Sequence, residues 1–297
     1  MNVYLNDGKD QLPGDLLLET VLRTDLAPVP RTLEFSVRLK SGLEAKLADR
    51  TPVWCGREHL KYVIVKRERG HPAGLVQGED ALQVGTYTAF LEGFEALAGP
   101  RSRAVIQHKA SLGALYLACG ARVNIGNDFT VARFAALVGD VPTYPLAIAL
   151  QEEGAAMVLR EGRMSIERLQ NLLQQEPVDS IGQFDSSAAQ GSELLERHEI
   201  PMGYSVNSGG AIVRGNYDIP RRVAFMPHHD ERMLYNLSRV AVTRRIINSQ
   251  MAQHIRAGDV VDVNGIKQLV ITGAHRFRAR EGITETLSRF WVGDLST

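Results

Sequence analysis

The residues best suited to chemistry in this sequence form one short cluster, Pro227-His228-His229-Asp230-Glu231. Imidazole and carboxylate groups are common zinc ligands, so the cluster suits a metal-dependent hydrolase that uses His228, His229 and Asp230. Two features weigh against a metal site: adjacent histidines on a strand point to opposite faces, and no helical H-E-x-x-H frame is present. The proline before the cluster and the polar run after it suit a surface turn in which Asp230 caps a helix.

A second candidate is His275, which comes directly after a predicted strand. A histidine that acts as a general base needs a serine or cysteine nucleophile beside it, and the sequence shows no nucleophile elbow. A histidine packed at the end of a barrel strand fits better. The glycines of Ser208-Gly209-Gly210 and Ile125-Gly126-Asn127 match no phosphate-binding fingerprint. We therefore expect no catalytic, cofactor-binding or metal-binding residue.

The charge balance argues against a dedicated nucleic-acid binder. Lys+Arg and Asp+Glu both total 34, so the formal net charge is zero, whereas such a binder carries a basic excess. The most basic spots are Arg221-Arg222 and Arg244-Arg245. Acids at an interface, or solvent, are their expected partners, and a nucleic-acid backbone is the alternative. Trp54 and Trp291 are expected to anchor a core or an interface.

Composition indicates a soluble globular protein, with 44% hydrophobic and 23% charged residues. Cys55 and Cys119 fit no metal or redox spacing and are expected to be reduced, partly buried thiols. The N-terminus lacks the basic start and apolar core of a signal peptide, and no apolar run approaches the length of a membrane span. The expected place of synthesis is the cytoplasm.

Two β-rich blocks flank a central region. In the last fifty residues, 259–263 and 266–273 are joined by Asn264-Gly265, which favours a tight type I′ turn, and 283–292 alternates as a further strand. The N-terminal block is predicted to hold strands at 16–22, 33–39, 52–54, 62–66 and within 81–90, with a loop at 70–78.

The central region is predicted to be mixed. Helices are expected at 111–118, 131–138, 146–153 and 167–175, with a hairpin formed by 156–160 and 163–166. Residues 179–216 look like connecting structure with a weak strand at 211–213, followed by a strand within 221–226 and a short helix at 230–237. The stretch 239–248 is ambiguous, but its β-branched residues favour a strand. No internal repeat is evident at solenoid or propeller spacing.

The predicted class is α+β and β-dominated, with two small β-barrel domains and an α/β module between them. The boundaries place the first barrel at 1–100, the module at 101–176, and a connecting segment with the second barrel at 177–297.

The order of segments resembles the baseplate hub, or tail hub, proteins of tailed bacteriophages and related contractile injection machines. Three groups of residues carry the resemblance: the early strand through Pro28-Val29-Pro30 into residues 31–35, the central stretches 134–139, 145–154 and 158–165, and the closing stretches 256–261, 269–271 and 274–277. The last group is similar to the "G-D-x-V … V … H-x-F" barrel common in that family.

The resemblance implies a virion structural protein without enzymatic activity. Hub proteins of this kind carry two tail-tube-like barrels per chain and form a homotrimeric ring that joins a sixfold tail tube, or distal tail protein, to a threefold central spike. Other implied partners are further baseplate proteins, the tape-measure protein and, transiently, DNA in the lumen, with no membrane contact. The implied location is the tail baseplate of the virion. The alternatives are the metal-dependent hydrolase and a monomeric β-barrel adaptor.

One departure from the family concerns the C-terminus. Many relatives continue into a lysozyme, peptidoglycan-binding or spike portion, whereas this sequence stops at Thr297. We therefore expect cell-wall cutting and membrane piercing to belong to another protein.

Overall fold

The computed structural model describes residues 1–40, 42–69, 83–181, 186–188, 193–215, 220–280 and 283–296. Strands predominate, as the sequence predicts. The expected loop at 70–78 lies outside the described residues.

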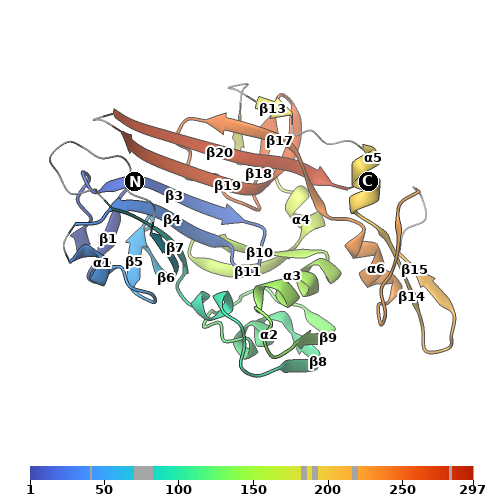
Figure 1. The fold of residues 1–297 in the computed structure, drawn as a ribbon. Coiled ribbons are helices and arrows are strands. Elements are labelled where there is room, and N and C mark those ends of the chain that lie inside the picture. Colours follow the sequence, from blue (N-terminus) through green and yellow to red (C-terminus); the bar gives the residue numbers. More distant parts are fainter. Residues whose placement is uncertain are drawn as a thin grey trace.

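The largest element is a sheet of thirteen strands, in which the first and last parts of the chain lie side by side (Figure 1). Its main path runs β13-β17-β20-β19-β3-β4-β7-β6-β5-β1-β2, while β18 pairs with β19 and β12 pairs with β18. The early strands are β1 (Val3–Leu5), β2 (Asp10–Gln11), β3 (Leu17–Asp25), β4 (Arg31–Arg38), β5 (Pro52–Cys55), β6 (Leu60–Arg69) and β7 (Val84–Leu91). The late strands are β12 (Asp179–Ser180), β13 (Ser186–Ala188), β17 (Ala241–Ser249), β18 (Val260–Val263), β19 (Ile266–Arg280) and β20 (Ile283–Leu295).

The N-terminal strands confirm the predicted period of two. On β4 the side chains of Leu33, Phe35 and Val37 are buried, while those between them face outward. A side chain alternates between the two faces of a strand, so this pattern places one face on the core. The short helix α1 (Leu43–Lys46) and the 3-10 turn η1 (Glu95–Ala98) complete this block.

The C-terminal hairpin also forms as predicted. Asn264 and Gly265 have φ angles of 56° and 81°, the left-handed pair that a type I′ turn requires. β19 is nevertheless far longer than expected and continues to Arg280, antiparallel to β20 along its length. The ambiguous stretch 239–248 is indeed a strand, β17.

The two β blocks share one sheet because β19 pairs with β3. The antiparallel register runs from Thr272 opposite Asp25 to Arg278 opposite Glu19. We call this pairing the internal junction.

The central region, called the insert (residues 105–173), packs beside this sheet. Its strands are β8 (Val105–Ser111), β9 (Thr130–Ala136), β10 (Ala155–Arg160) and β11 (Arg163–Arg168), and its helices are α2 (Leu112–Ala118), α3 (Thr143–Glu152) and α4 (Leu169–Leu173). The predicted hairpin is confirmed, with positive φ at Glu161 and Gly162. Helix α2 begins after Ser111, whose hydroxyl accepts from Ala114 N at 3.2 Å.

One predicted helix is wrong. Residues 131–138 are not helical, because 130–136 form β9, which pairs antiparallel with β8. Val131 and Phe134 are buried at helical spacing, yet Ala136 is buried as well, and the partner strand satisfies the backbone. Pairing with a strand that the sequence pattern does not reveal therefore overrides the local pattern.

A further unit, called the arm (residues 193–215 and 220–237), projects from the side of the molecule (Figure 1). It holds a three-stranded sheet in the order β15-β14-β16, in a region predicted to be mainly connecting structure. Its elements are α5 (Glu193–Glu199), β14 (Met202–Val206), β15 (Ile212–Arg214), β16 (Val223–Phe225) and α6 (Glu231–Leu237).

Three apolar cores hold these parts together. The first joins the N-terminal strands to α2, α3, β9 and β10, so the insert and the first β block share a core. The second lies inside the C-terminal strands around Val261, Val270 and Phe290. A small third core links β10 and α4 to β18 and β19 through Val158, Leu172 and Leu269.

Candidate assembly site

The long sheet presents one continuous polar face, built from β17, β20, β19, β3, β4, β7 and β6. On β3, β4 and β7 the side chains of the opposite face are buried, because residues i and i+2 share a face. The charged side chains of this polar face are Glu19, Arg23, Asp25, Glu34, Arg38, Lys66, Glu68, Arg276, Arg278, Glu285 and Arg289. Positively and negatively charged side chains are interspersed across the strands, so the face is charged without a strong excess of either sign.

Polar contacts on this face lie at and beside the internal junction. Arg276 of β19 lies 3.9 Å from Glu19 of β3 and 3.9 Å from Glu285 of β20. Arg23 and Asp25 pair at 2.7 Å, and Thr272 Oγ1 donates to Asp25 at 2.6 Å. The ion pairs are exposed or partly exposed, so each contributes little stability by itself.

A more enclosed ion-pair cluster lies at one end of the junction. Glu58, in the turn between β5 and β6, accepts from Arg31 Nη1 at 2.5 Å and from the guanidinium of Arg256. Burial opposes ionisation of Glu58, but the two guanidinium groups outweigh it and lower its pKa. Arg31 is only 4% exposed, so Glu58 neutralises a buried cation. No local sequence signal identifies Glu58, because Arg31 and Arg256 are 27 and 198 residues away.

His275 lies within β19, in mid-strand and not at its end. Its Nδ1 lies 2.8 Å from Ser288 Oγ, and Ser288 Oγ also accepts from Ala252 N at 2.8 Å. Both side chains are buried, and burial lowers the pKa of His275 to about 4. A histidine and a serine at this distance resemble a catalytic pair, but neither is open to a substrate. The pair therefore fastens β19 to β20, in line with the packed histidine that the sequence indicates.

The His228-His229-Asp230 cluster does not converge on one point. His229 Nε2 lies 2.9 Å from Glu152 Oε1, while Asp230 Oδ1 accepts from Met233 N at 2.8 Å and caps α6, as predicted. Across the described ranges, no group of three His, Cys, Asp or Glu side chains is arranged to hold a metal ion. The hydrogen bond to Glu152 raises the pKa of His229, which makes the contact an ion pair at mildly acid pH.

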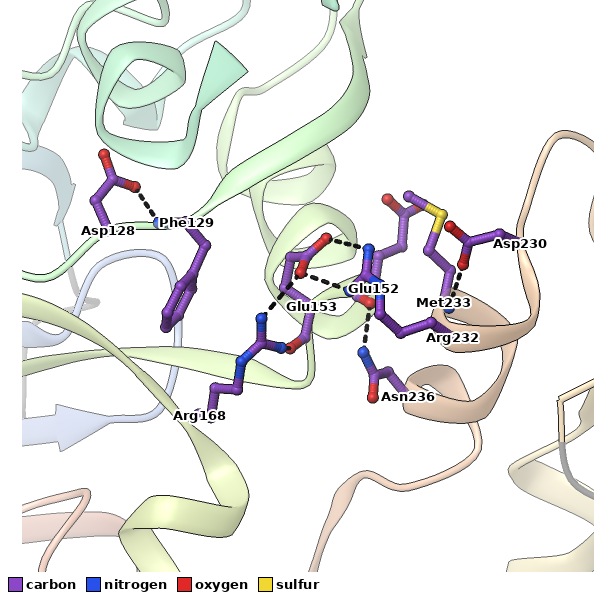
Figure 2. Close-up of polar contacts among 9 residues, drawn as sticks. All are labelled: Asp128, Phe129, Glu152, Glu153, Arg168, Asp230, Arg232, Met233 and Asn236. Atoms are coloured by element: carbon purple, nitrogen blue, oxygen red, sulfur yellow. Dashed lines mark hydrogen bonds and ion pairs between the residues drawn. The ribbon is translucent and has the colours of Figure 1, made fainter. Parts of the chain in front are cut away.

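Glu152 and Glu153 fasten the arm to the insert, where α3 ends (Figure 2). Arg232 of α6 donates to the two Glu153 oxygens at 2.6 and 2.9 Å, and Arg168 Nη1 donates to the Glu153 carbonyl at 2.5 Å. Asn236 Nδ2 donates to the Glu152 carbonyl at 2.8 Å. Because Glu153 is 2% exposed, two cations neutralise one buried carboxylate, and Figure 2 shows them converging from different elements. No pattern in the sequence indicates this contact.

The arginine pairs have local partners. Arg244 binds Glu196 at 2.6 Å and Asp294 at 2.7 Å, which are acidic contacts of the expected kind. Arg221 and Arg222 instead donate to the carbonyls of Ile200 and His198 at 3.3 and 3.0 Å. Cys55 and Cys119 are free and fully buried, more so than predicted, whereas Trp54 and Trp291 are only half-buried.

Exposed large apolar side chains gather on the insert and the arm. Of the fourteen among the described residues, twelve lie there, the exceptions being Val178 and Ile266. The twelve are Ile106, Leu117, Leu137, Val138, Val141, Tyr144, Ile148, Val206, Ile212, Val223, Phe225 and Tyr235. Exposed apolar side chains that lie together suit a surface to binding another protein.

The arm sheet has two different faces. Val206 lies opposite Ile212, and Tyr204 lies opposite Phe225 with ring centroids 5.2 Å apart, all on the outer face. The inner face packs on α6 so closely that a Cβ on Gly203 would lie 2.7 Å from Leu234. The outer face therefore presents a partly apolar surface to solvent.

No helix among the described residues combines the length and apolar character needed to traverse a lipid bilayer. No protein-family model and no curated protein matches the chain by sequence.

Solved structures nevertheless share the fold over almost the whole chain. The 43 kDa tail protein of prophage MuSo2 from Shewanella oneidensis superposes with a TM-score of 0.63 at 11% identity, covering 99% of this chain and 98% of that one. A tail protein from Neisseria meningitidis gives 0.61 at 9% identity, covering 99% and 95%.

A third structure broadens the comparison. A component of the type VI secretion system of E. coli, described as similar to the bacteriophage tail proteins gp27 and gp5, gives a TM-score of 0.51 at 8% identity, covering 94% and 73%. At these identities the likeness concerns the fold. The chain has the fold of phage tail proteins, and the resemblance noted in the sequence is confirmed at that level.

Proposed function

We propose that this protein is a structural hub of a phage-like tail, a ring of three copies that joins a sixfold tail tube to a threefold spike. The observation that carries the proposal is a repeated strand order within one sheet. Each end of the chain contributes four adjacent antiparallel strands, and the internal junction joins the two sets edge to edge. Three chains with two sets each supply six sets, which match the symmetry of a sixfold tube.

The polar face is assigned to the channel of this ring. A lumen that passes the tape-measure protein and then DNA has to be wet and must not bind its cargo tightly. The mixed charges of the polar face suit that requirement, because a strongly basic lining would hold the phosphate backbone. On this proposal the tail tube, or a distal tail protein, stacks on one rim of the ring.

The apolar surface of the insert and the arm is assigned to the spike and to surrounding baseplate proteins. Figure 1 places β8, β9 and α2 at the end of the molecule away from β19 and β20, so the insert's part of this surface lies apart from that part of the channel face. The proposal assigns no catalytic residue. The 1–100, 101–176 and 177–297 division is retained as the proposed domain organisation, with the module between two tube-like units.

Native mass tests the proposal. Light scattering over a range of concentrations, with and without the cognate tail-tube protein, should give a species of three times the 32.7 kDa chain mass. A particle that remains a single chain under all these conditions would overturn the ring and favour the monomeric adaptor.

A further inference from the structure

The two ends of the chain have the same strand plan. In the N-terminal set the spatial order is β3-β4-β7-β6, so the strands appear as first, second, fourth and third along the chain. In the C-terminal set the spatial order is β13-β17-β20-β19, again first, second, fourth and third. Neighbouring strands are antiparallel in both sets.

Local irregularities show which residues of β6 and β19, the third strands of the two sets, are equivalent. Each carries a register shift in the same place, between Ile64 and Lys66 on β6 and between Val270 and Thr272 on β19. Just before each hairpin, one backbone bond recurs: Arg50 N donates to Ile64 O, and Gly258 N donates to Val270 O, at 2.8 and 2.9 Å.

The backbone also repeats at these donor positions. Arg50 and Gly258 both have positive φ, of 66° and 92°. A non-glycine residue is uncommon in that region, so the shared conformation marks equivalent positions in the two sets. Ile64 therefore corresponds to Val270, and five residues further on Arg69 corresponds to His275.

In the internal junction, the part of β19 that follows its register shift pairs with a further strand. There β19 pairs with β3, the first strand of the next set, and Leu22 lies opposite His275. Leu26, just after β3, donates its backbone N–H to Ile271 O at 3.1 Å. The third strand of one set thus receives the first strand of the next.

The same edge of β6 is open. β5 pairs with β6 only as far as Val63, and no strand in the described ranges pairs with that side of Lys66–Arg69. These four residues are exposed. At the other end of the sheet lies β13, the first strand of the C-terminal set, which among the described residues pairs only with β17. The open edge of β6 and the unmatched strand β13 thus lie on opposite sides of the paired strands β17-β20-β19-β3-β4-β7.

We propose that β13 of a second copy pairs antiparallel with β6 and reproduces the internal junction between copies. The inference rests on the proposed ring and specifies its contact. In the N-terminal set, Leu22 pairs across strands with Leu33, which in turn pairs with Ala89. In the C-terminal set, Ala188 pairs with Arg245, which in turn pairs with Val292.

Ala89 and Val292 in turn face Ile64 and Val270, which are the equivalent positions of the two third strands. Ala188 therefore corresponds to Leu22. The register of the internal junction then sets Ala188 of the second copy opposite Arg69.

A groove lies beside this edge of β6. It has a volume of about 630 Å³, and its lining includes Asp49, Arg50, Pro52, Val63, Ile64 and Val65. Val65 is the equivalent of Ile271, beside which Leu26 packs in the internal junction. The groove is thus the counterpart of the place beside β19 where Leu26 lies in the internal junction.

Cysteine cross-linking tests the register. The variant carrying Arg69→Cys and Ala188→Cys should, on mild oxidation, give linked dimers and trimers on a non-reducing gel that return to single chains on reduction. Mixing the two single variants should give linked dimers only. The native thiols, Cys55 and Cys119, are buried and do not compete.

Two controls sharpen the result. Arg67→Cys with Ala188→Cys, two residues out of register, should link at least fivefold more slowly. Glu19→Cys with Arg278→Cys bridges the internal junction and should form a disulfide within one chain, which verifies the oxidation conditions.

The outcomes separate the two proposals. A trimer by light scattering that gives no Arg69–Ala188 link, or that links the shifted pair equally fast, overturns the strand register and leaves the ring standing. A protein that stays monomeric removes the ring and this contact with it.

Discussion

Glu153 and Arg232, seventy-nine residues apart in the chain, form two hydrogen bonds of 2.6 and 2.9 Å where α6 meets the end of α3. Arg168 completes the neutralisation of the buried carboxylate, so one acidic side chain connects the arm, α3 and β11. Together with the bonds from His229 and Asn236 to Glu152, this contact fastens the arm to the insert.

Arg232→Ala should lower the free energy of unfolding by about 1–3 kcal/mol, because it leaves a buried carboxylate with one cation of its two. Urea denaturation measures the loss. Arg163→Ala is the matched control, since Arg163 is an exposed arginine of the same insert, and its effect should stay within about 0.5 kcal/mol. Equal effects for the two variants would contradict the assignment.

Glu58→Gln should cost about 2–4 kcal/mol, because the change leaves Arg31 buried without a carboxylate partner. Arg256 loses the same partner, so the internal junction loosens. The control is Glu92→Gln, which removes an exposed pair with Lys61 at 2.6 Å and should cost less than about 1 kcal/mol. Chemical denaturation of both variants decides the point: a Glu58 variant as stable as the Glu92 variant would rule out a role in the junction.

His275 makes stability depend on pH. The pKa of His275 in the folded protein, about 4, lies below the usual value near 6.5. Between these two pH values the unfolded chain therefore binds a proton that the folded chain does not bind. The contribution is complete above about pH 6.5 and is lost as the pH falls toward 4, a change of roughly 3 kcal/mol.

The measurement for His275 is urea unfolding at several pH values between 4 and 7. His275→Gln should lower stability at pH 7 and should remove this pH dependence, so the difference from the parent protein should shrink as the pH falls toward 4. Parallel pH profiles for the two proteins would show that another group carries the dependence.

Trp291→Ala should cost about 1–2 kcal/mol, less than the 3–5 kcal/mol of a fully buried tryptophan. Trp291 is half-buried on the polar face, opposite Thr272 on one neighbouring strand and Ile246 on the other. Trp291→Phe should retain most of the stability in thermal unfolding. A loss above about 3 kcal/mol would mean that the side chain is fully covered in solution, as in an assembled ring.

The sequence predicts individual strands well where one face is buried and the other is wet. β4 shows this, since its alternation reports burial directly. The same logic fails for β9, because Val131 and Phe134 at a spacing of three imitate a helix, and only β8 beside them reveals the strand. The local pattern of one strand does not show which other strand it pairs with.

Sequence patterns do not predict the candidate site, for a related reason. The internal junction joins Thr24 to Gly273, 249 residues later, and no pattern in either strand specifies the other. The repeated strand plan is also hidden, because equivalent positions carry unlike residues: Leu33 corresponds to Arg245 and Glu34 to Ile246. Backbone pairing is shared between the two sets, whereas side chains are not.

The internal junction also sets the order of events during synthesis. β3 leaves the ribosome early, but its partner β19 emerges about 250 residues later, an interval of roughly 12–50 seconds at typical elongation rates. Throughout that interval the nascent chain carries β3 with one unpaired edge, exposed to other chains. A long loop must then close before the strands meet, which makes this pairing slow. Expression yield should therefore depend on how well the cell protects that edge until the last strands appear.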